Sequence, residues 1–223
     1  AVGKNAFSDC TALSYVSFGA NLNEIGDNAF SGCYSLKKAE LKKGVTYIGK
    51  GAFKGCSSLS FAVIPDGVAF IGEKAFFGCS ALQKVMLPES VTELHTSTFE
   101  NCSSLLKAEL RGVKTIGDRA FYNCAALSEI SFSPSLKEIG AFAFSVNTSL
   151  EKVTLPPNTE LVSDEAFSRC TSLKTVTVFS EALKMSATAL DGCTSLYAIY
   201  GSSAFSSEAA IGIRNATVSF DCV

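Results

Sequence analysis

The sequence is built on a repeat of 23 residues, and this period constrains the fold more than any other feature. The string Ala-Phe-x-x-Cys-x-x-Leu begins at Ala6 and recurs along the chain. Nine copies follow one another at this interval, with a single step of 22 residues between Phe99 and Phe121, and Leu190 replaces the Phe of the last copy. A period of this length indicates an array whose units pack only against their neighbours. The sequence therefore predicts one elongated solenoid.

Each unit contains a short alternating stretch after the Leu of that string. In the fourth unit the apolar residues Leu82, Val85 and Leu87 alternate with other residues, which is typical of a strand buried on one face. We expect a strand of about five residues in each unit. Prolines such as Pro88 follow the stretch, and because Pro has no amide donor it marks the end of the strand. A second extended segment, as at residues 45–49, and one helical turn at the Ala-Phe step complete the unit.

A Gly or Asn precedes the Cys of most units. Either residue tolerates the left-handed backbone conformation that closes a helical turn. Left-handed residues are therefore expected at Gly32, Gly55, Gly78, Asn101, Asn123 and Gly192.

The repeated Phe and Cys positions are predicted to form the core. One unit cannot bury its own Phe, but stacked units can. The predicted core comprises Phe7, Phe30, Phe53, Phe76, Phe99, Phe121, Phe144, Phe167, Cys10, Cys33, Cys56, Cys79, Cys102, Cys124, Cys170 and Cys193. Asn147 stands for Cys in the seventh unit, and the cysteines are interpreted as a ladder of small buried side chains.

The pattern Ile-Gly-x-x-Ala-Phe-x-x-Cys-x-x-Leu-x-x-Val-x-Leu-Pro is similar to that of the BspA-type branch of the leucine-rich repeat superfamily. The resemblance implies a right-handed coil with a parallel β-sheet on the inner face and short helical turns or extended segments on the outer face. It covers residues 1–201, as an array of nine units. Residues 202–223 resemble the short helix and strand that cap such arrays, and the abrupt start predicts further repeats upstream.

The cysteines do not suggest metal or redox chemistry. Zinc sites use pairs of ligands at short spacing, which the sequence lacks. Stacked strands lie about 4.8 Å apart, so distance does not forbid disulfides between neighbouring units, but parallel side-chain directions argue against them. The odd total of 9 Cys leaves at least one thiol free, and Cys222 lies outside the ladder, where reactivity or an intermolecular bridge is most worth testing.

The sequence offers no set of catalytic residues. The single His, His95, occupies a position where most other units have Gly, and it is interpreted as an exposed turn residue on the outer edge. No base is then available to a thiolate or hydroxyl nucleophile over most of the array. We expect a protein that is not an enzyme and that binds no cofactor and no metal.

The charge balance excludes some partners. With 19 basic and 21 acidic residues the net charge is −2, which gives no reason to expect binding to nucleic acid or to an anionic membrane surface. No apolar run approaches the roughly 18 residues of a membrane-spanning helix. We expect a monomer that does not insert into a membrane.

Functional residues are sought where the repeat leaves the side chain free, on the outward face of the inner strands. The predicted ligand-contact face comprises Tyr15, Lys38, Glu40, Phe61, Val63, Lys84, Met86, Lys107 and Glu109. Its Lys and Glu residues are expected to form cross-strand charge pairs. The apolar residues Phe61, Val63 and Met86 indicate a contact surface, unless a neighbouring loop or the curvature of the sheet shields them.

The predicted function is a non-enzymatic interaction module that binds a protein or an extracellular-matrix ligand through its inner sheet. The resemblance implies an adhesin-like setting, so an extracellular or cell-surface location is expected from the family alone. The alternative is a structural spacer that presents an upstream domain. A spacer would bind nothing by itself, whereas an interaction module would bind a ligand through this face.

Overall fold

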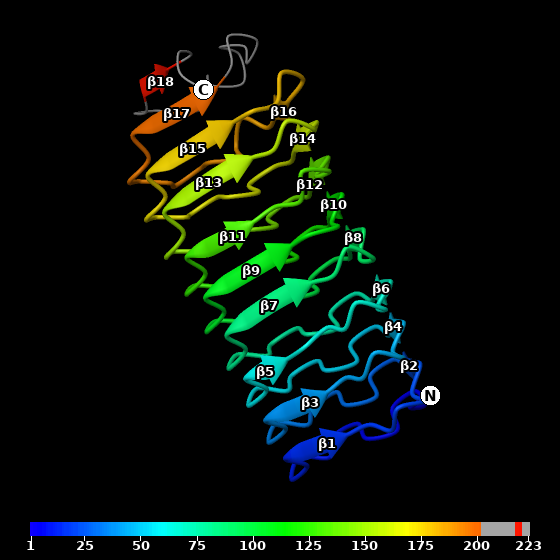
Figure 1. Ribbon diagram of the computed structural model, residues 1–223. Coiled ribbons are helices and arrows are strands. Elements are labelled where there is room, and N and C mark those ends of the chain that lie inside the picture. The colour runs from blue at the N-terminus through cyan, green and yellow to red at the C-terminus, as the bar shows by residue number, and fades with distance from the viewer. Residues whose placement is uncertain (202–216, 220–223) are drawn as a thin grey trace.

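Each 23-residue unit forms one coil, and the coils stack into a parallel β-solenoid of about eight turns (Figure 1). The computed structural model describes residues 1–201 and 217–219. The N-terminus lies at one end of the stack and β17 lies at the other. The expected solenoid of parallel strands is therefore confirmed.

Every coil contributes two short strands, one to each side of the stack. The odd-numbered strands make the inner ladder: β1 (Tyr15–Ser17), β3 (Lys38–Glu40), β5 (Phe61–Ala62), β7 (Lys84–Leu87), β9 (Lys107–Leu110), β11 (Glu129–Ser131), β13 (Lys152–Leu155), β15 (Thr175–Val178) and β17 (Ala198–Gly201). The even-numbered strands make the outer ladder: β2 (Glu24–Ile25), β4 (Tyr47–Ile48), β6 (Phe70–Ile71), β8 (Glu93–Leu94), β10 (Thr115–Ile116), β12 (Glu138–Ile139), β14 (Leu161–Val162) and β16 (Lys184–Met185).

Paired strands stand in register by one unit, so equivalent residues form columns along the stack. Tyr15 lies opposite Lys38, and Lys38 lies opposite Phe61. The strands have two to four residues, fewer than the predicted five. In the expected cap, β18 (Thr217–Ser219) pairs with β17, while the expected short helix lies outside the described residues.

The prediction of helical turns on the outer face is wrong, since residues 1–201 and 217–219 contain no helix. The amides of Asn28, Phe30 and Gly32 each donate to a carbonyl of the next coil at 2.8 Å. Those of Ala29 and Ser31 donate to the residue three positions back. An α-helix directs its backbone bonds along its own axis, whereas here alternate amides bond across coils. The segment is thus a third ladder made of turns.

Two left-handed residues frame this turn ladder in each of the first eight coils. In the second coil they are Asn28 with φ 51° and Gly32 with φ 74°. The left-handed conformation expected just before the Cys is found at Gly32, Gly55, Gly78, Asn101, Asn123 and Gly192. The other column, four residues earlier, includes Lys74, Arg119 and Phe142, all residue types for which this conformation is unfavourable. Ordinary residues at these positions gave no signal in the sequence.

The Phe side chains form one continuous stack through the core. Neighbouring ring centroids lie 5.2 to 5.4 Å apart, with planes within 14° of parallel, from Phe7 to Phe167. Phe18 and Phe132 meet this stack edge-on. The rings are buried except that of Phe7, which is 41% exposed because no described coil covers the outer side of the first unit.

The Cys side chains form a second column beside the Phe stack. The Cys56 thiol donates to the carbonyl oxygen of Phe30 at 3.1 Å, and the Cys56 amide donates to Phe53 within its own coil. The same thiol bond, at 3.0 to 3.3 Å, is made by Cys33, Cys79, Cys102, Cys124, Cys170 and Cys193. Cys10 is exposed and Cys193 is half-buried, as they lie in the end units. All eight described cysteines are free thiols; Cys222 lies outside the described residues.

Asn147 interrupts the thiol column. Its side-chain oxygen accepts a hydrogen bond from the Cys124 amide at 2.8 Å, while its buried Nδ2 has no hydrogen-bond partner in the described part of the chain. A buried donor left unpaired costs about 1–3 kcal/mol. The seventh unit therefore carries a local defect in an otherwise regular core.

We expect Asn147→Cys to raise the free energy of unfolding by about 1 kcal/mol, because it removes the unpaired amide and restores the thiol bond. The Cys124 amide loses the Asn147 oxygen as acceptor and is expected to bond to the Phe121 carbonyl instead, as the Cys56 amide bonds to that of Phe53. The matched control is Cys102→Asn, which introduces the same defect into a regular unit and is expected to lower the free energy of unfolding. Urea unfolding followed by circular dichroism measures both changes. A less stable Asn147→Cys protein would contradict this account of the column.

Candidate functional site

The nine predicted contact residues lie on the outward face of the inner ladder between β1 and β9. Four are apolar or aromatic and well exposed: Phe61 by 55%, Tyr15 by 51%, Val63 by 50% and Met86 by 38%. The charged members Lys38, Glu40, Lys84, Lys107 and Glu109 surround them and are half-buried or exposed. Phe61, Val63 and Met86 lie on adjacent coils, so the structure brings the predicted apolar residues together; Tyr15 lies two coils away from Phe61.

The inner ladder is interrupted where these apolar residues meet. β5 has two residues and pairs with β3, but not with β7. The amides of Lys37 and Leu106 donate to the preceding coil at 2.9 and 2.8 Å, whereas the equivalent amide of Gln83 makes no such bond in the described structure. We call this boundary between the coil of β5 and β6 and the coil of β7 and β8 the junction.

The outer ladder is interrupted at the same junction, between β6 and β8. The amides of Gly72 and Gly117 donate to the preceding coil at 2.8 and 2.7 Å, but among the described residues His95 forms no equivalent bond. The backbones approach closely at this position, since a Cβ on Gly72 would lie 2.6 Å from the Lys50 amide nitrogen. Ser163 keeps the bond at 2.9 Å, so a small side chain is tolerated.

His95 differs from its counterparts in the bulk of its ring. The imidazole packs against Phe70 with ring centroids 4.9 Å apart, and its Nδ1 lies 3.3 Å from a carboxylate oxygen of Glu93. It lies at the outer edge as expected, but it is half-buried and not exposed, because its ring packs against Phe70. We attribute the interrupted outer ladder to this ring. The turn ladder still joins the two coils, because the Phe53 amide donates to the carbonyl of Ala75 at 2.8 Å.

A hollow of about 220 Å³ opens at the junction on the inner face. Its lining is mostly apolar and comprises Phe61, Ala62, Val63, Ile64, Asp66, Lys84, Met86, Leu87, Pro88 and Arg111. The sequence analysis identified Phe61, Val63 and Met86 but not the hollow, because the repeat pattern does not show which hydrogen bonds between strands are missing. The only hint was His95 at a Gly position.

A second hollow, of about 430 Å³, lies where the inner ladder is interrupted again, between β11 and β13. The outer ladder is continuous there, through β12 and β14. Its lining is polar: Ser128, Glu129, Ile130, Ser149, Glu151, Lys152 and Thr154. The first hollow alone combines an interruption on both sides of the coil with exposed apolar side chains, among the residues that the structure describes.

Charged residues flank the apolar hollow on both sides. On β3, the carboxylate of Glu40 accepts hydrogen bonds from Lys38 and from Lys42, the latter at 3.2 Å, and these bonds hold the pKa of Glu40 below its usual value. These pairs lie within one strand and the residues just after it, not across strands as expected, and more than one cation shares the carboxylate.

On β9, Glu109 is shared in the same way. Its carboxylate oxygens lie 3.5 Å from the ammonium groups of Lys84 and Lys107 and from the guanidinium of Arg111. Desolvation raises the pKa of Glu109, but the two lysines outweigh this effect and the pKa lies below its usual value. Lys107 also pairs with Glu129 on the next strand.

Burial suppresses the reactivity of thiols in the middle of the column. It raises the pKa of Cys56 to about 12, and it raises the pKa values of Cys79 and Cys102 well above the usual 9.0. The thiolate is the reactive form of Cys, so these thiols stay neutral at physiological pH. The described residues hold no group of three or more His, Cys, Asp or Glu side chains arranged to bind a metal ion.

Within residues 1–201 and 217–219, the structure has no helix with the length and hydropathy needed to cross a bilayer.

A family model described as "BspA type Leucine rich repeat region" matches residues 1–106 and 105–209, in six copies. No curated protein matches the chain. Two solved structures are about a third identical to it over the aligned residues. A leucine-rich repeat protein from Bacteroides ovatus is 32% identical with a TM-score of 0.82, over 90% of this chain and 52% of that one. The T. pallidum leucine-rich repeat protein is 33% identical with a TM-score of 0.62, over 67% and 70%.

A third structure is described as a leucine rich cell surface protein from Faecalibacterium prausnitzii. It is 27% identical with a TM-score of 0.59, over 99% of this chain and 66% of that one. The chain spans about half the length of the Bacteroides ovatus protein. These likenesses agree with the observed stack of coils.

Cys10 is expected to react with iodoacetamide at pH 8 at least about tenfold faster than Cys56, because Cys10 is exposed while burial keeps Cys56 protonated. A Cys222→Ser variant removes the thiol outside the described residues. Peptide mass spectrometry of the native protein measures each rate. Rapid labelling of Cys56 in folded protein would show that the column opens or is activated.

The amides of Gln83 and His95 are expected to exchange with deuterium faster than those of Leu106 and Gly117, by about tenfold or more. The first two make no bond to the preceding coil in the described structure, whereas the second two do. Amide-resolved hydrogen exchange of the whole chain provides the comparison. Equal protection at all four positions would mean that the ladders are continuous at the junction.

Proposed function

The chain belongs to the BspA-type leucine-rich repeat family, and from that premise we propose that it is a non-enzymatic interaction module. It binds a protein or an extracellular-matrix ligand through the inner ladder. The observation that carries this proposal is the cluster of Phe61, Val63 and Met86, which are exposed together on a regular scaffold.

The surroundings of the cluster resemble the anatomy of a protein interface. Such interfaces have an apolar centre in which charged residues are scarce, and a polar rim that stays accessible to solvent. Here the apolar hollow is the centre, and Lys38 with Glu40 on one side and Lys107 with Glu109 on the other form the rim. Adjacent exposed apolar residues favour association, because a partner that covers them removes their surface from water.

The scaffold also holds the cluster ready for binding. Phe61 pairs with Lys38 in the inner ladder, and β7, which carries Met86, pairs with β9 along all four of its residues. Side chains on ordered strands lose little conformational freedom when a ligand docks. The apolar patch is therefore presented at a low entropic cost.

A cell-surface or secreted location is part of the proposal. It is supported by the family to which the chain belongs and by the likeness to the Faecalibacterium prausnitzii structure, which is that of a leucine rich cell surface protein. An extracellular module of this kind would meet matrix proteins and other cells.

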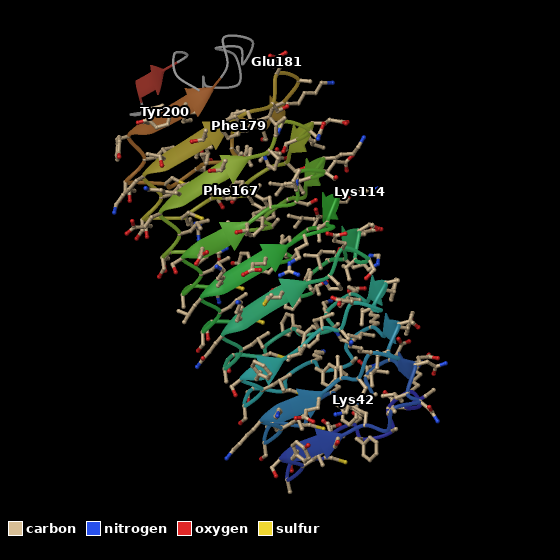
Figure 2. The ribbon with its side chains drawn as sticks, viewed as in Figure 1. Lys42, Lys114, Phe167, Phe179, Glu181 and Tyr200 are labelled. Atoms are coloured by element: carbon tan, nitrogen blue, oxygen red, sulfur yellow. The ribbon has the colours of Figure 1, made fainter. Side chains whose placement is uncertain are left out.

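Replacing both Phe61 and Met86 by Ser is expected to weaken ligand binding at least tenfold, since the central apolar contacts of an interface carry most of its energy. Biolayer interferometry against immobilised matrix proteins and intact bacteria measures the loss. Phe179→Ser is the matched control, as Phe179 is 38% exposed far along the array (Figure 2).

Two outcomes would count against the proposal. Ligand binding that survives the double replacement would place the contact elsewhere on the solenoid. A chain that binds nothing, while a longer protein containing it does bind, would favour the spacer function.

A further inference from the structure

The hollow at the junction also indicates the chemistry of its partner. We infer that it binds an acidic peptide segment in which one bulky apolar side chain lies between carboxylates. The inference rests on the proposed function, because it names the class of ligand that the inner face accepts. Three features carry it: the size of the hollow, the charges on its flanks and the spacing between them.

The size of the hollow fits one side chain. Small-molecule sites have volumes of about 300 to 1,000 Å³ and enclose most of their ligand. The hollow has about 220 Å³ and opens onto the inner face beside the exposed side chains of Phe61, Val63 and Met86. A mostly apolar hollow of this size suits one large apolar side chain of a peptide whose backbone stays outside the hollow.

Cations are in excess on both flanks of the hollow. On β3, the one carboxylate of Glu40 faces both Lys38 and Lys42. On β9, the carboxylate of Glu109 faces Lys84, Lys107 and Arg111, of which Lys107 is also shared with Glu129.

Neither flank has enough carboxylate to neutralise its own cations, although the whole chain has a net charge of −2. Asp66, at the turn after β5, adds one carboxylate to the lining and faces no cation at ion-pair distance among the described residues. Complementary potentials across an interface steer a partner and favour its binding. The local excess of positive charge therefore selects an acidic partner.

The two cationic flanks stand at a spacing that a short peptide can span. β3 and β9 are three strand steps apart, or roughly 14 Å at about 4.8 Å per step. An extended chain covers about 3.3 Å per residue, so about five residues reach from one flank to the other. A segment that follows the axis of the solenoid would place its carboxylates on Lys42 and Arg111 with an apolar side chain in the hollow between. Figure 2 labels Lys42 just beyond β3.

The test is a selection that assumes nothing about the ligand. The whole chain is immobilised and exposed to a library of random 12-residue peptides displayed on phage, with the Phe61→Ser, Met86→Ser double variant used to remove peptides that bind elsewhere. We expect the retained peptides to carry a net negative charge and at least one Phe, Leu, Ile, Met or Trp between acidic residues.

The selected peptides are then synthesised, and their affinities test whether binding depends on the cations that flank the hollow. In fluorescence anisotropy, a Lys42→Glu, Arg111→Glu variant is expected to bind about tenfold more weakly, and wild-type binding is expected to weaken between 50 and 300 mM NaCl. The control is Lys137→Glu, because Lys137 is an exposed lysine paired with Glu160 next to the outer ladder. All these side chains are partly exposed, and circular dichroism checks that the variants fold.

The outcomes separate the partner chemistry from the proposed function. Winners that depend on Phe61 and Met86 but are neutral or basic would overturn the acidic partner and leave the binding face intact. Equal affinity for wild type and the Lys42→Glu, Arg111→Glu variant would overturn it as well. A selection that yields no peptide dependent on Phe61 and Met86 would overturn the inference, and binding to the matrix panel would then decide the proposed function alone.

Discussion

The structure depends on hydrogen bonds that cross from each coil to the next at a constant offset of one repeat. The inner ladder, the outer ladder and the turn ladder all use this offset. Because equivalent residues are held at one spacing, identical side chains stack on one another. The Phe rings and the Cys thiols are both consequences of that register. A side chain that does not fit one coil therefore affects the coil beside it.

This register explains why a candidate binding site forms at the junction. A perfectly regular stack would present a flat ladder without depressions, whereas interrupted ladders let two coils separate on one side. His95 occupies a position where the backbones nearly touch, and both strands of its coil, β7 and β8, lack pairing with the preceding coil. The turn ladder and the Phe stack still hold the coils together. The result is a local hollow within a regular scaffold. Its lining includes Phe61, Val63 and Met86, side chains that point away from the core.

Much of the fold could be predicted from the sequence, because residues at equivalent positions of a repeat have the same structural role in every unit. The stacked parallel strands and the left-handed Gly and Asn residues followed from spacing and residue type. The prediction of a helical turn was wrong, because the Ala-Phe residues of one unit do not show that alternate amides bond to the next coil. The second left-handed column was hidden at Lys74, Arg119 and Phe142, because residues that disfavour this conformation occupy those positions.

The candidate site was predicted only in part. Alternation along the strands was enough to identify Phe61, Val63 and Met86 as outward residues. It could not show that they surround a hollow, because the hollow arises from a bond that is not made. The sharing of Glu40 and Glu109 among several cations was also invisible, as it depends on side chains from different coils meeting across strands.

The claim that binding centres on the junction is tested most directly by hydroxyl-radical footprinting of the chain with and without a saturating selected peptide. Side chains covered by the ligand oxidise more slowly, and mass spectrometry reads each one. Phe61 and Met86 should be protected, while Phe179 and Tyr197, exposed elsewhere on the array, should keep their rates. Unchanged oxidation of Phe61 and Met86 in the bound state would contradict the assignment of this face as the binding site.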